Sequence, residues 1–278
     1  MIISEQLKFL FIHNPKVAGS SIRKVLLPYN SSPFELWHQR YVQSLERVVD
    51  LSHLAANDLR TILTVPKGYF RFGFVREPYE RFLSAVHEHG KQNNLDLSSS
   101  KENLSQWVLN KLTPTSVRYD WNLSHFCPQH YYFYSGNTCE ADFIGTQADL
   151  NSDWIKVLSI LDLDPELHSL GNERQRFANP PKVSILEHLT IPALQRINLL
   201  YAKDWFWFGN RFSSILTGGL PSHSHEDRVY AIRTPEGRST FYGEPPNLSL
   251  GEKVGYLTTR VETLTNSLKI ASYEDPCR

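Results

Sequence analysis

A buried-strand pattern that stops at a short polar loop constrains this chain more than any other feature. Residues 7–12 (LKFLFI) are an apolar run typical of a buried strand, and residues 13–15 (HNP) cannot continue it. After the loop, Ile22, Val25 and Leu26 have helical spacing. The segment therefore predicts a strand, a loop and a helix in direct succession.

This loop carries groups suited to an anion. Backbone N–H groups at the start of a helix, together with the helix dipole, favour a phosphate or sulfate. Ser20 or Ser21 can supply a capping hydroxyl, and Gly19 gives the backbone freedom just before the helix. Lys16 adds a mobile positive charge, but it precedes the glycine, so the loop is not the GxxxxGK[ST] of nucleotide triphosphatases. A plain strand-to-helix turn is the alternative interpretation, because short Gly-Ser loops are common.

A second strand-to-helix unit follows about fifty residues later. Residues 69–75 (YFRFGFV) alternate as a strand does, and a helix opens at Glu77. Arg76 lies just beyond the strand, where open α/β sheets place ligand contacts, and its guanidinium suits a phosphate. Ser84, two helical turns further on, can face the same crevice. The alternative for Arg76 is an ion pair with a nearby carboxylate such as Glu77 or Glu80.

The rest of the chain continues the alternation of strands and helices. The stretch between the two units is polar and is expected to be helical. Further on we predict a helix at 101–111, a strand at 142–145 and helices near 149–162 and 190–204. This order predicts an α/β protein: a three-layer, P-loop-like nucleotide-binding fold with a central parallel sheet covered by helices on both faces.

Composition changes toward the end of the chain, where 6 of the 14 glycines fall within the last 67 residues. We therefore predict one domain over 1–211 and a C-terminal appendage over 212–278. Within the appendage, 229–234 and 239–242 flank a turn and suggest a hairpin. An apolar stripe over 250–268 predicts a helix that either packs on its own domain or pairs two copies into a homodimer.

Charge and composition exclude several classes of function. Lys and Arg (29) balance Asp and Glu (29), so nothing favours nucleic acid as a partner. No stretch approaches the ~18 apolar residues that span a bilayer, and Met1 leads into a strand-like run without a basic leader, so we expect a cytoplasmic protein without a transmembrane segment. The three cysteines match no metal-binding spacing, and we expect no metal.

Two blocks, in order, resemble a known family. HNPKVAGSS (13–21) and FGFVREPYERFLSAV (72–86) are similar to the 5′-phosphosulfate loop and the 3′-phosphate motif of sulfotransferases that use 3′-phosphoadenosine 5′-phosphosulfate (PAPS). The resemblance is to the carbohydrate branch, which includes uronyl 2-O-sulfotransferases. It continues through 125–133, 142–154 and 201–210.

The resemblance implies a role for each matching residue. For the donor these residues are Lys16, Gly19, Ser20 and Ser21 at the 5′-phosphosulfate, and Arg76 and Ser84 at the 3′-phosphate. Lys16 would also be catalytic, because it would offset charge that grows on the departing phosphate. No metal need take part.

A histidine is the expected general base, since an imidazole accepts a proton near neutral pH. His53 stands 23 residues before Arg76, a separation similar to that of the base in the 2-O-sulfotransferases that this chain resembles. His13, or an Asp or Glu, is the alternative. His87 and His89 lie on the helix that follows Arg76 and are expected to be exposed.

The acceptor would be a hydroxyl, of a carbohydrate by the resemblance. Rings and polar groups that could line its site, or could equally be core, are Arg118, Tyr119, Trp121, His125, His130, Tyr131 and Tyr132. Arg174 and Arg176 precede the helix predicted at 190, and by the resemblance this is where a loop would close over the nucleotide. The predicted function is a PAPS-dependent sulfotransferase. The alternatives are a kinase-like nucleotide phosphotransferase, which lacks its usual motifs here, and a non-catalytic nucleotide-binding or scaffold protein.

Overall fold

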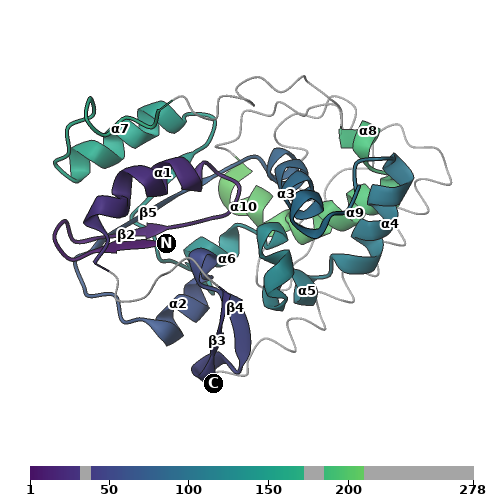
Figure 1. The fold of residues 1–278 in the computed structure, drawn as a ribbon, viewed down its shortest axis with the longest axis horizontal. Helices are drawn as coiled ribbons and strands as arrows, with labels where there is room; N and C mark the ends of the chain where they lie inside the picture. The colour runs from purple at the N-terminus through teal and green to yellow at the C-terminus, as the bar shows by residue number, and fades with distance from the viewer. Residues whose placement is uncertain (32–38, 172–184, 210–278) are drawn as a thin grey trace. The chain divides into compact units, whose positions relative to one another are not determined.

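The computed structural model describes residues 1–31, 39–171 and 185–209 (Figure 1). The chain divides into two compact units. In the described part of the chain, the first holds residues up to 96 and 112–171, and the second holds 97–111 and 185–209.

The strands of the first unit are short, and six helices and four 3-10 turns connect them within the described residues. The strands are β1 (Ile2–Ser4), β2 (Phe9–Ile12), β3 (Gln39–Val42), β4 (Arg47–Asp50), β5 (Phe70–Val75), β6 (Tyr134–Ser135), β7 (Thr138–Cys139) and β8 (Phe143–Thr146). The helices are α1 (Gly19–Leu26), α2 (Ala56–Ile62), α3 (Pro78–Asn93), α5 (Pro114–Tyr119), α6 (His130–Phe133) and α7 (Leu150–Ile160). The 3-10 turns are η1 (Leu27–Tyr29), η2 (Gln43–Leu45), η3 (Leu51–His53) and η4 (Trp121–Phe126).

The second unit is helical where the structure describes it. Its helices are α4 (Lys101–Lys111), α8 (Ile185–His188), α9 (Ile191–Leu200) and α10 (Ala202–Phe208). The Oγ of Ser105 on α4 accepts a hydrogen bond from the backbone N–H of Thr190, 2.8 Å away, where α9 begins. The helix predicted at 101–111 is confirmed, and the one predicted near 190–204 is divided between α9 and α10.

The central sheet has the strand order β1-β2-β5-β8. Strands β2, β5 and β8 are parallel, and β1 is an antiparallel edge strand. In register, Ile12 lies opposite Gly73, and Val75 lies opposite Thr146. The parallel strands therefore end at one edge of the sheet, and the loops that follow them meet there. The predicted α/β class with a mostly parallel sheet is confirmed.

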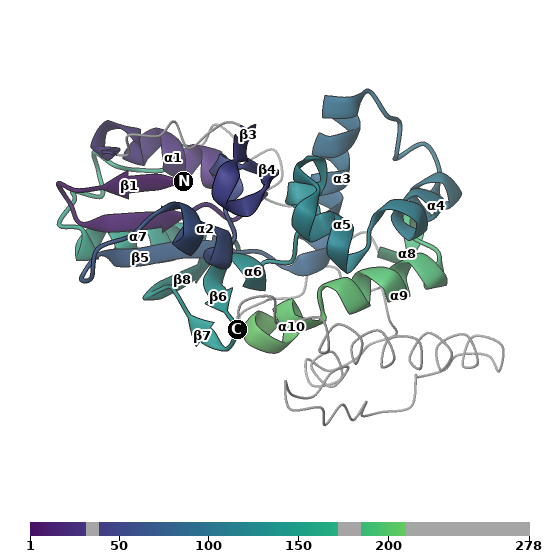
Figure 2. The same ribbon diagram turned by 90° about the horizontal axis from the view of Figure 1, so that it is seen from below.

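Helices cover both faces of this sheet. Figures 1 and 2 show α1 and α7 on one face and α2 and α6 on the other. Alternation along β5 decides which residue meets which helix: Phe72 and Phe74 enter the core under α1 and α7, whereas Gly73 faces Phe133 of α6. The buried core on the first face comprises Ile2, Phe9, Phe11, Val17, Ile22, Leu26, Phe72, Phe74, Trp154, Val157, Leu158 and Leu161.

The expectation that the stretch between the two units is helical is wrong in part. Strands β3 and β4 form an antiparallel hairpin there, before the short turns and helix α2. Glu46 closes the hairpin in a left-handed conformation (φ 50°). The side chains of β3 are largely exposed, so this strand lacks the apolar alternation by which a strand is recognised in a sequence.

Some predictions fall outside the described residues. These are the hairpin and the apolar stripe of the appendage, the homodimer predicted through that stripe, and the loop near Arg174 and Arg176 that would close over the nucleotide. The boundary near 211 stays a prediction. None of the helices that the structure describes has the length and apolar character needed to cross a membrane.

Replacing Gly73 by alanine should destabilise the first unit. An added Cβ would lie 2.6 Å from Cε1 of Phe133 and 2.7 Å from the backbone oxygen of Ile12, and the strand cannot move away from its neighbour. We expect Gly73→Ala to lower the free energy of unfolding by about 1–3 kcal/mol in urea denaturation. Gly171→Ala is the control, because nothing lies within 4 Å of its Cβ position, and it should change stability by less than about 0.5 kcal/mol. Equal effects of the two substitutions would contradict this packing argument.

Candidate functional site

The loop after β2 turns through left-handed backbone at Lys16 and Ala18, both with φ of 65°. Left-handed residues alternating with ordinary ones point successive N–H groups into one concavity, which is a common anion-binding arrangement. Ala18 is the N-cap of α1 and makes no side-chain capping bond, so the prediction that Ser20 or Ser21 caps the helix is wrong. Both serines instead lie in the first turn, with Ser20 exposed and Ser21 half-buried.

Gly19 is required for packing rather than for backbone freedom. It does not have positive φ, and a Cβ at this position would lie 1.9 Å from Nε2 of His13. The buried His13 ring therefore fits against the first turn of α1 because residue 19 has no side chain. The first turn contains no acidic residue that would repel an anion.

One buried amide, Gln129, joins the two predicted binding segments. Its Nε2 donates to the backbone oxygen of Arg76 at 2.7 Å, and its Oε1 accepts from the backbone N–H of Arg76 at 2.9 Å. The same Oε1 accepts from Nδ2 of Asn14 at 2.9 Å, and Asn14 also donates to the backbone oxygen of Phe74. The start of the loop after β2 is thereby fixed to the end of β5. Sequence reasoning missed Gln129, although it lies within the block 125–133.

The two predicted cations are both ion-paired with helix α3. Nε of Arg76 lies 3.2 Å from Oε2 of Glu80, and Nζ of Lys16 lies 3.2 Å from Oε2 of Glu88. Burial raises the pKa of the Glu88 carboxyl but the Lys16 ammonium lowers it, and the net pKa is below its ordinary value. The predicted alternative for Arg76, a pair with Glu80, is thus present, whereas Glu77 caps α3 by accepting from the N–H of Glu80.

Ser84 shares the face of α3 that holds these cations. Glu80, Ser84 and Glu88 are spaced by four residues, so they lie one above the other on the helix. Because Glu80 pairs with Arg76 and Glu88 with Lys16, half-buried Ser84 lies between the two pairs. The structure therefore places Ser84 on the face of α3 whose carboxylates pair with Lys16 and Arg76. The expected exposure is correct for His87 but wrong for His89, which is buried with its ring edge-on to Phe126.

His53 is anchored to the loop after β2. Its Nδ1 lies 2.8 Å from the backbone oxygen of His13. A carbonyl oxygen only accepts, so Nδ1 of neutral His53 carries the proton and Nε2 keeps a free lone pair. Burial lowers the pKa of His53, and Lys16 and the amino group of Met1 lower it too, while Asp50 and the bond to His13 oppose them. The net pKa is below its ordinary value, which favours the neutral form of the ring.

The His53 ring lies in a cluster of three histidines. Its centroid is 4.3 Å from the His13 ring and 5.4 Å from the His125 ring. Burial, and then the charge of His53, lower the pKa values of both neighbours well below the ordinary value. His13 is 4% exposed and packs on Phe11 and Gly19, so it supports the loop, and His53 is the better placed base of the two.

A pocket opens beside His53. It is lined by Arg47, Val49, Asp50, His53, Leu54, Ala55, Asp58, Val117, Arg118, Asp120, Trp121, Ser124, Cys127 and Tyr132. Three of the seven residues predicted for an acceptor site line this pocket, namely Arg118, Trp121 and Tyr132. Of the other four, His125 lies against His53, His130 is buried against Tyr131, and Tyr119 is exposed.

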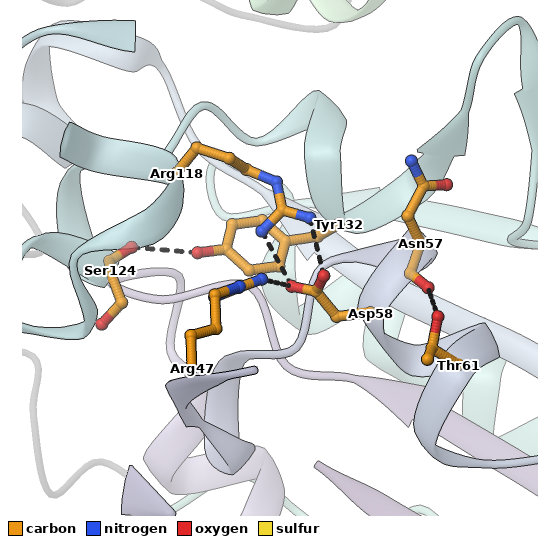
Figure 3. A network of polar contacts seen from close by, with 7 residues as sticks. All are labelled: Arg47, Asn57, Asp58, Thr61, Arg118, Ser124 and Tyr132. Carbon is orange, nitrogen blue, oxygen red and sulfur yellow. Dashed lines mark hydrogen bonds and ion pairs between the residues drawn. The ribbon is translucent and has the colours of Figure 1, made fainter. Parts of the chain in front are cut away.

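One carboxylate organises the wall of this pocket (Figure 3). Asp58 on α2 accepts two hydrogen bonds from Arg118, at 2.8 and 2.9 Å, and one from Arg47 at 2.7 Å. Burial raises the pKa of Asp58 but the two guanidiniums lower it, with a net pKa below its ordinary value. Both guanidiniums also lie 5.2 Å from the Tyr119 ring centroid. Sequence reasoning found no signal for Arg47 or Asp58. Arg47, Asp58 and Arg118 come from separate elements, and only the fold brings them together.

A mostly parallel sheet with helices on both faces and a strand-loop-helix unit at its carboxyl edge defines an α/β, P-loop-like fold, and this edge suits an anionic ligand. The profile of the sulfotransferase family matches residues 1–209, and the chain belongs to this family. The chain is also 26% identical, over 125 residues, to carbohydrate sulfotransferase 10 of Xenopus laevis. That alignment covers 42% of this chain and 31% of the other protein. No solved structure matches the chain. The family predicted from the two sequence blocks is confirmed.

Removing the Gln129 amide should loosen the site. Gln129→Ala leaves the N–H and oxygen of Arg76 and one N–H of Asn14 without this partner in a buried place. We expect the free energy of unfolding to fall by at least about 2 kcal/mol, measured in urea. Gln43→Ala, at an exposed glutamine, is the control and should cost less than about 0.5 kcal/mol. A Gln129 variant as stable as this control would show that the amide does not hold the loops together.

Proposed function

We propose that the protein transfers a sulfuryl group from PAPS to a hydroxyl acceptor, with His53 as the general base. The observation that carries this proposal is the bond from Nδ1 of His53 to the backbone oxygen of His13, the first residue of the anion loop. It holds a neutral imidazole, with a free Nε2, directly beside the loop that carries Lys16. A donor-binding loop and a proton acceptor are the two parts that sulfuryl transfer needs side by side.

The residues at the carboxyl edge of the sheet fit PAPS. The left-handed turn at Lys16 and Ala18 and the first turn of α1, with Gly19, Ser20 and Ser21, suit the 5′-phosphosulfate. Arg76 and Ser84 lie together on the α3 side and suit the 3′-phosphate, which distinguishes PAPS from ATP. PAPS, when bound, supplies the sulfuryl group on a phosphate leaving group.

Each catalytic residue has one task. Nε2 of His53 takes the proton from the acceptor hydroxyl, whose oxygen keeps the electron pair for attack on sulfur. The Lys16 ammonium stabilises negative charge on the leaving phosphate. The Gln129 bonds fix the distance between these loops, so that little rearrangement is needed when the acceptor arrives.

We infer that the acceptor is a carbohydrate that presents a hydroxyl at the mouth of the pocket beside His53. Trp121 offers an aromatic surface there, and Arg47, Asp50 and Ser124 offer polar groups, a mixture that suits a ring bearing hydroxyls. The name of the Xenopus laevis relative, a carbohydrate sulfotransferase, agrees with this class of acceptor.

Arg76 should provide selectivity for the 3′-phosphate. We expect Arg76→Ala to weaken binding of adenosine 3′,5′-bisphosphate by about 10- to 100-fold in calorimetry, since a charge-assisted hydrogen bond contributes about 1.5–3 kcal/mol. AMP, which lacks the 3′-phosphate, should bind weakly to both proteins. Arg71→Ala on β5, where the arginine pairs with Glu140, is the control and should leave this affinity unchanged. If the wild type prefers ATP to adenosine 3′,5′-bisphosphate, the PAPS assignment is wrong and a phosphotransferase becomes the better proposal.

His53 and Lys16 should both be needed for turnover. We expect His53→Ala to lower kcat by about 100- to 10,000-fold, the usual contribution of a general base, while adenosine 3′,5′-bisphosphate still binds. Lys16→Ala should lower kcat and weaken nucleotide binding as well. His87→Ala, at an exposed histidine on α3, is the control. Because the pKa of His53 is lowered from its ordinary value, wild-type activity should extend to lower pH than an ordinary imidazole base would allow, and it should decline as the ring becomes protonated. A His53→Ala enzyme with wild-type kcat would rule out this base.

A further inference from the structure

We propose that Asp50 is a positioning residue for His53, which stabilises the protonated imidazole during turnover without touching it. This inference rests on the proposed role of His53 as the base. Asp50 ends β4 and is the N-cap of η3, the single turn that carries His53 at its last position. Asp50 lies directly before this turn and His53 ends it, and both residues line the same pocket.

The Asp50 carboxylate is held rigidly by uncharged donors. Its Oδ1 accepts from the backbone N–H of Ser52 at 3.0 Å and from the Ser52 hydroxyl at 2.6 Å. Its Oδ2 accepts from the hydroxyl of Ser124 on η4 at 3.3 Å. Asp50 is 8% exposed, and its hydrogen-bond partners carry no charge. Water screens the field of a buried carboxylate only weakly, so the field acts strongly on neighbouring groups.

The other titratable groups that face His53 are basic. Lys16 and the buried His13 come from the loop after β2, His125 comes from η4, and the amino group of Met1 comes from the residue before β1. Burial lowers the pKa of that amino group to about 4. Asp50 is the largest of the groups that favour the imidazolium.

The backbone oxygen of His13 and the Asp50 carboxylate therefore act on the His53 ring in different ways. When the acceptor O–H bond breaks, its proton passes to Nε2 of His53, and the positive charge that results is balanced by Asp50. Since Nδ1 already donates to the oxygen of His13, Asp50 acts through its electric field and not through a hydrogen bond to the ring. The backbone oxygen of His13 sets the tautomer of His53, and the Asp50 carboxylate sets the basicity of its ring.

The test removes the charge and keeps the turn. Asparagine is as good an N-cap as aspartate and can still accept from Ser52, so Asp50→Asn should fold. We expect kcat on the pH plateau to fall about tenfold, a loss of about 1.4 kcal/mol of stabilisation of the charged ring. The acid limb of the pH profile should move to lower pH, because an imidazole without this neighbour protonates less readily. Titration of the His53 ring protons by NMR should show the same direction of change.

Two further variants separate the charge from the turn. Asp50→Ser also retains a capping side chain without charge, and it should behave like Asp50→Asn. Asp120 caps η4 in the same way, through the N–H of Asn122 at 2.9 Å, but it is exposed. Asp120→Asn should therefore leave the titration of His53 as in the wild type. An unchanged acid limb and unchanged His53 titration in both Asp50 variants would overturn the proposal, even if kcat fell.

The readouts also separate this inference from the proposed function. If the wild type transfers no sulfuryl group, or if His53→Ala keeps full activity, the proposed function has failed and Asp50 has no catalytic role. The NMR titration needs no turnover, so it still shows whether Asp50 governs the basicity of the ring. A changed titration with an unchanged kcat would contradict the catalytic part of the proposal.

Discussion

The hydrogen bonds of the buried Gln129 amide hold together the edge of the sheet on which the site is built. Parallel strands bring the loops after β2 and β5 to one edge, but a sheet alone does not fix the loops that leave it. Gln129 bonds both backbone groups of Arg76 and the side chain of Asn14, and it thereby fixes both loops. The positions of Lys16 and Arg76 on the face of α3 depend on this arrangement.

Two buried groups of the site, His53 and Asp58, differ in the charges that surround them. Burial and nearby basic groups lower the pKa of His53, and one carboxylate, Asp50, opposes them. On the far wall of the pocket the balance is different, because Asp58 bonds two guanidiniums, Arg47 and Arg118. The first arrangement suits proton transfer, and the second holds a rigid polar wall against which an acceptor can be placed.

Local signals predicted those parts of the fold that local physics dictates. The apolar runs of β2 and β5 and the start of α3 were correctly placed, because burial of a central strand and an acidic N-cap are visible in a few consecutive residues. The β3–β4 hairpin was missed because its first strand is exposed, and the cap of α1 was misplaced because Ala18 adopts a left-handed conformation that its residue type disfavours. His89 was expected on the surface, yet η4 covers it.

By itself the sequence determined the family, the two strand-loop-helix units and the residues of the anion loop, since these rest on motifs and periodicities within short segments. The tertiary structure decided which atoms meet. Only packing places the carbonyl of His13 against His53, forty residues away, or Arg118 against Asp58, sixty residues away. Such contacts depend on where whole elements lie, and side-chain geometry of that kind is set by the packed sheet and helices and not by neighbours in the chain.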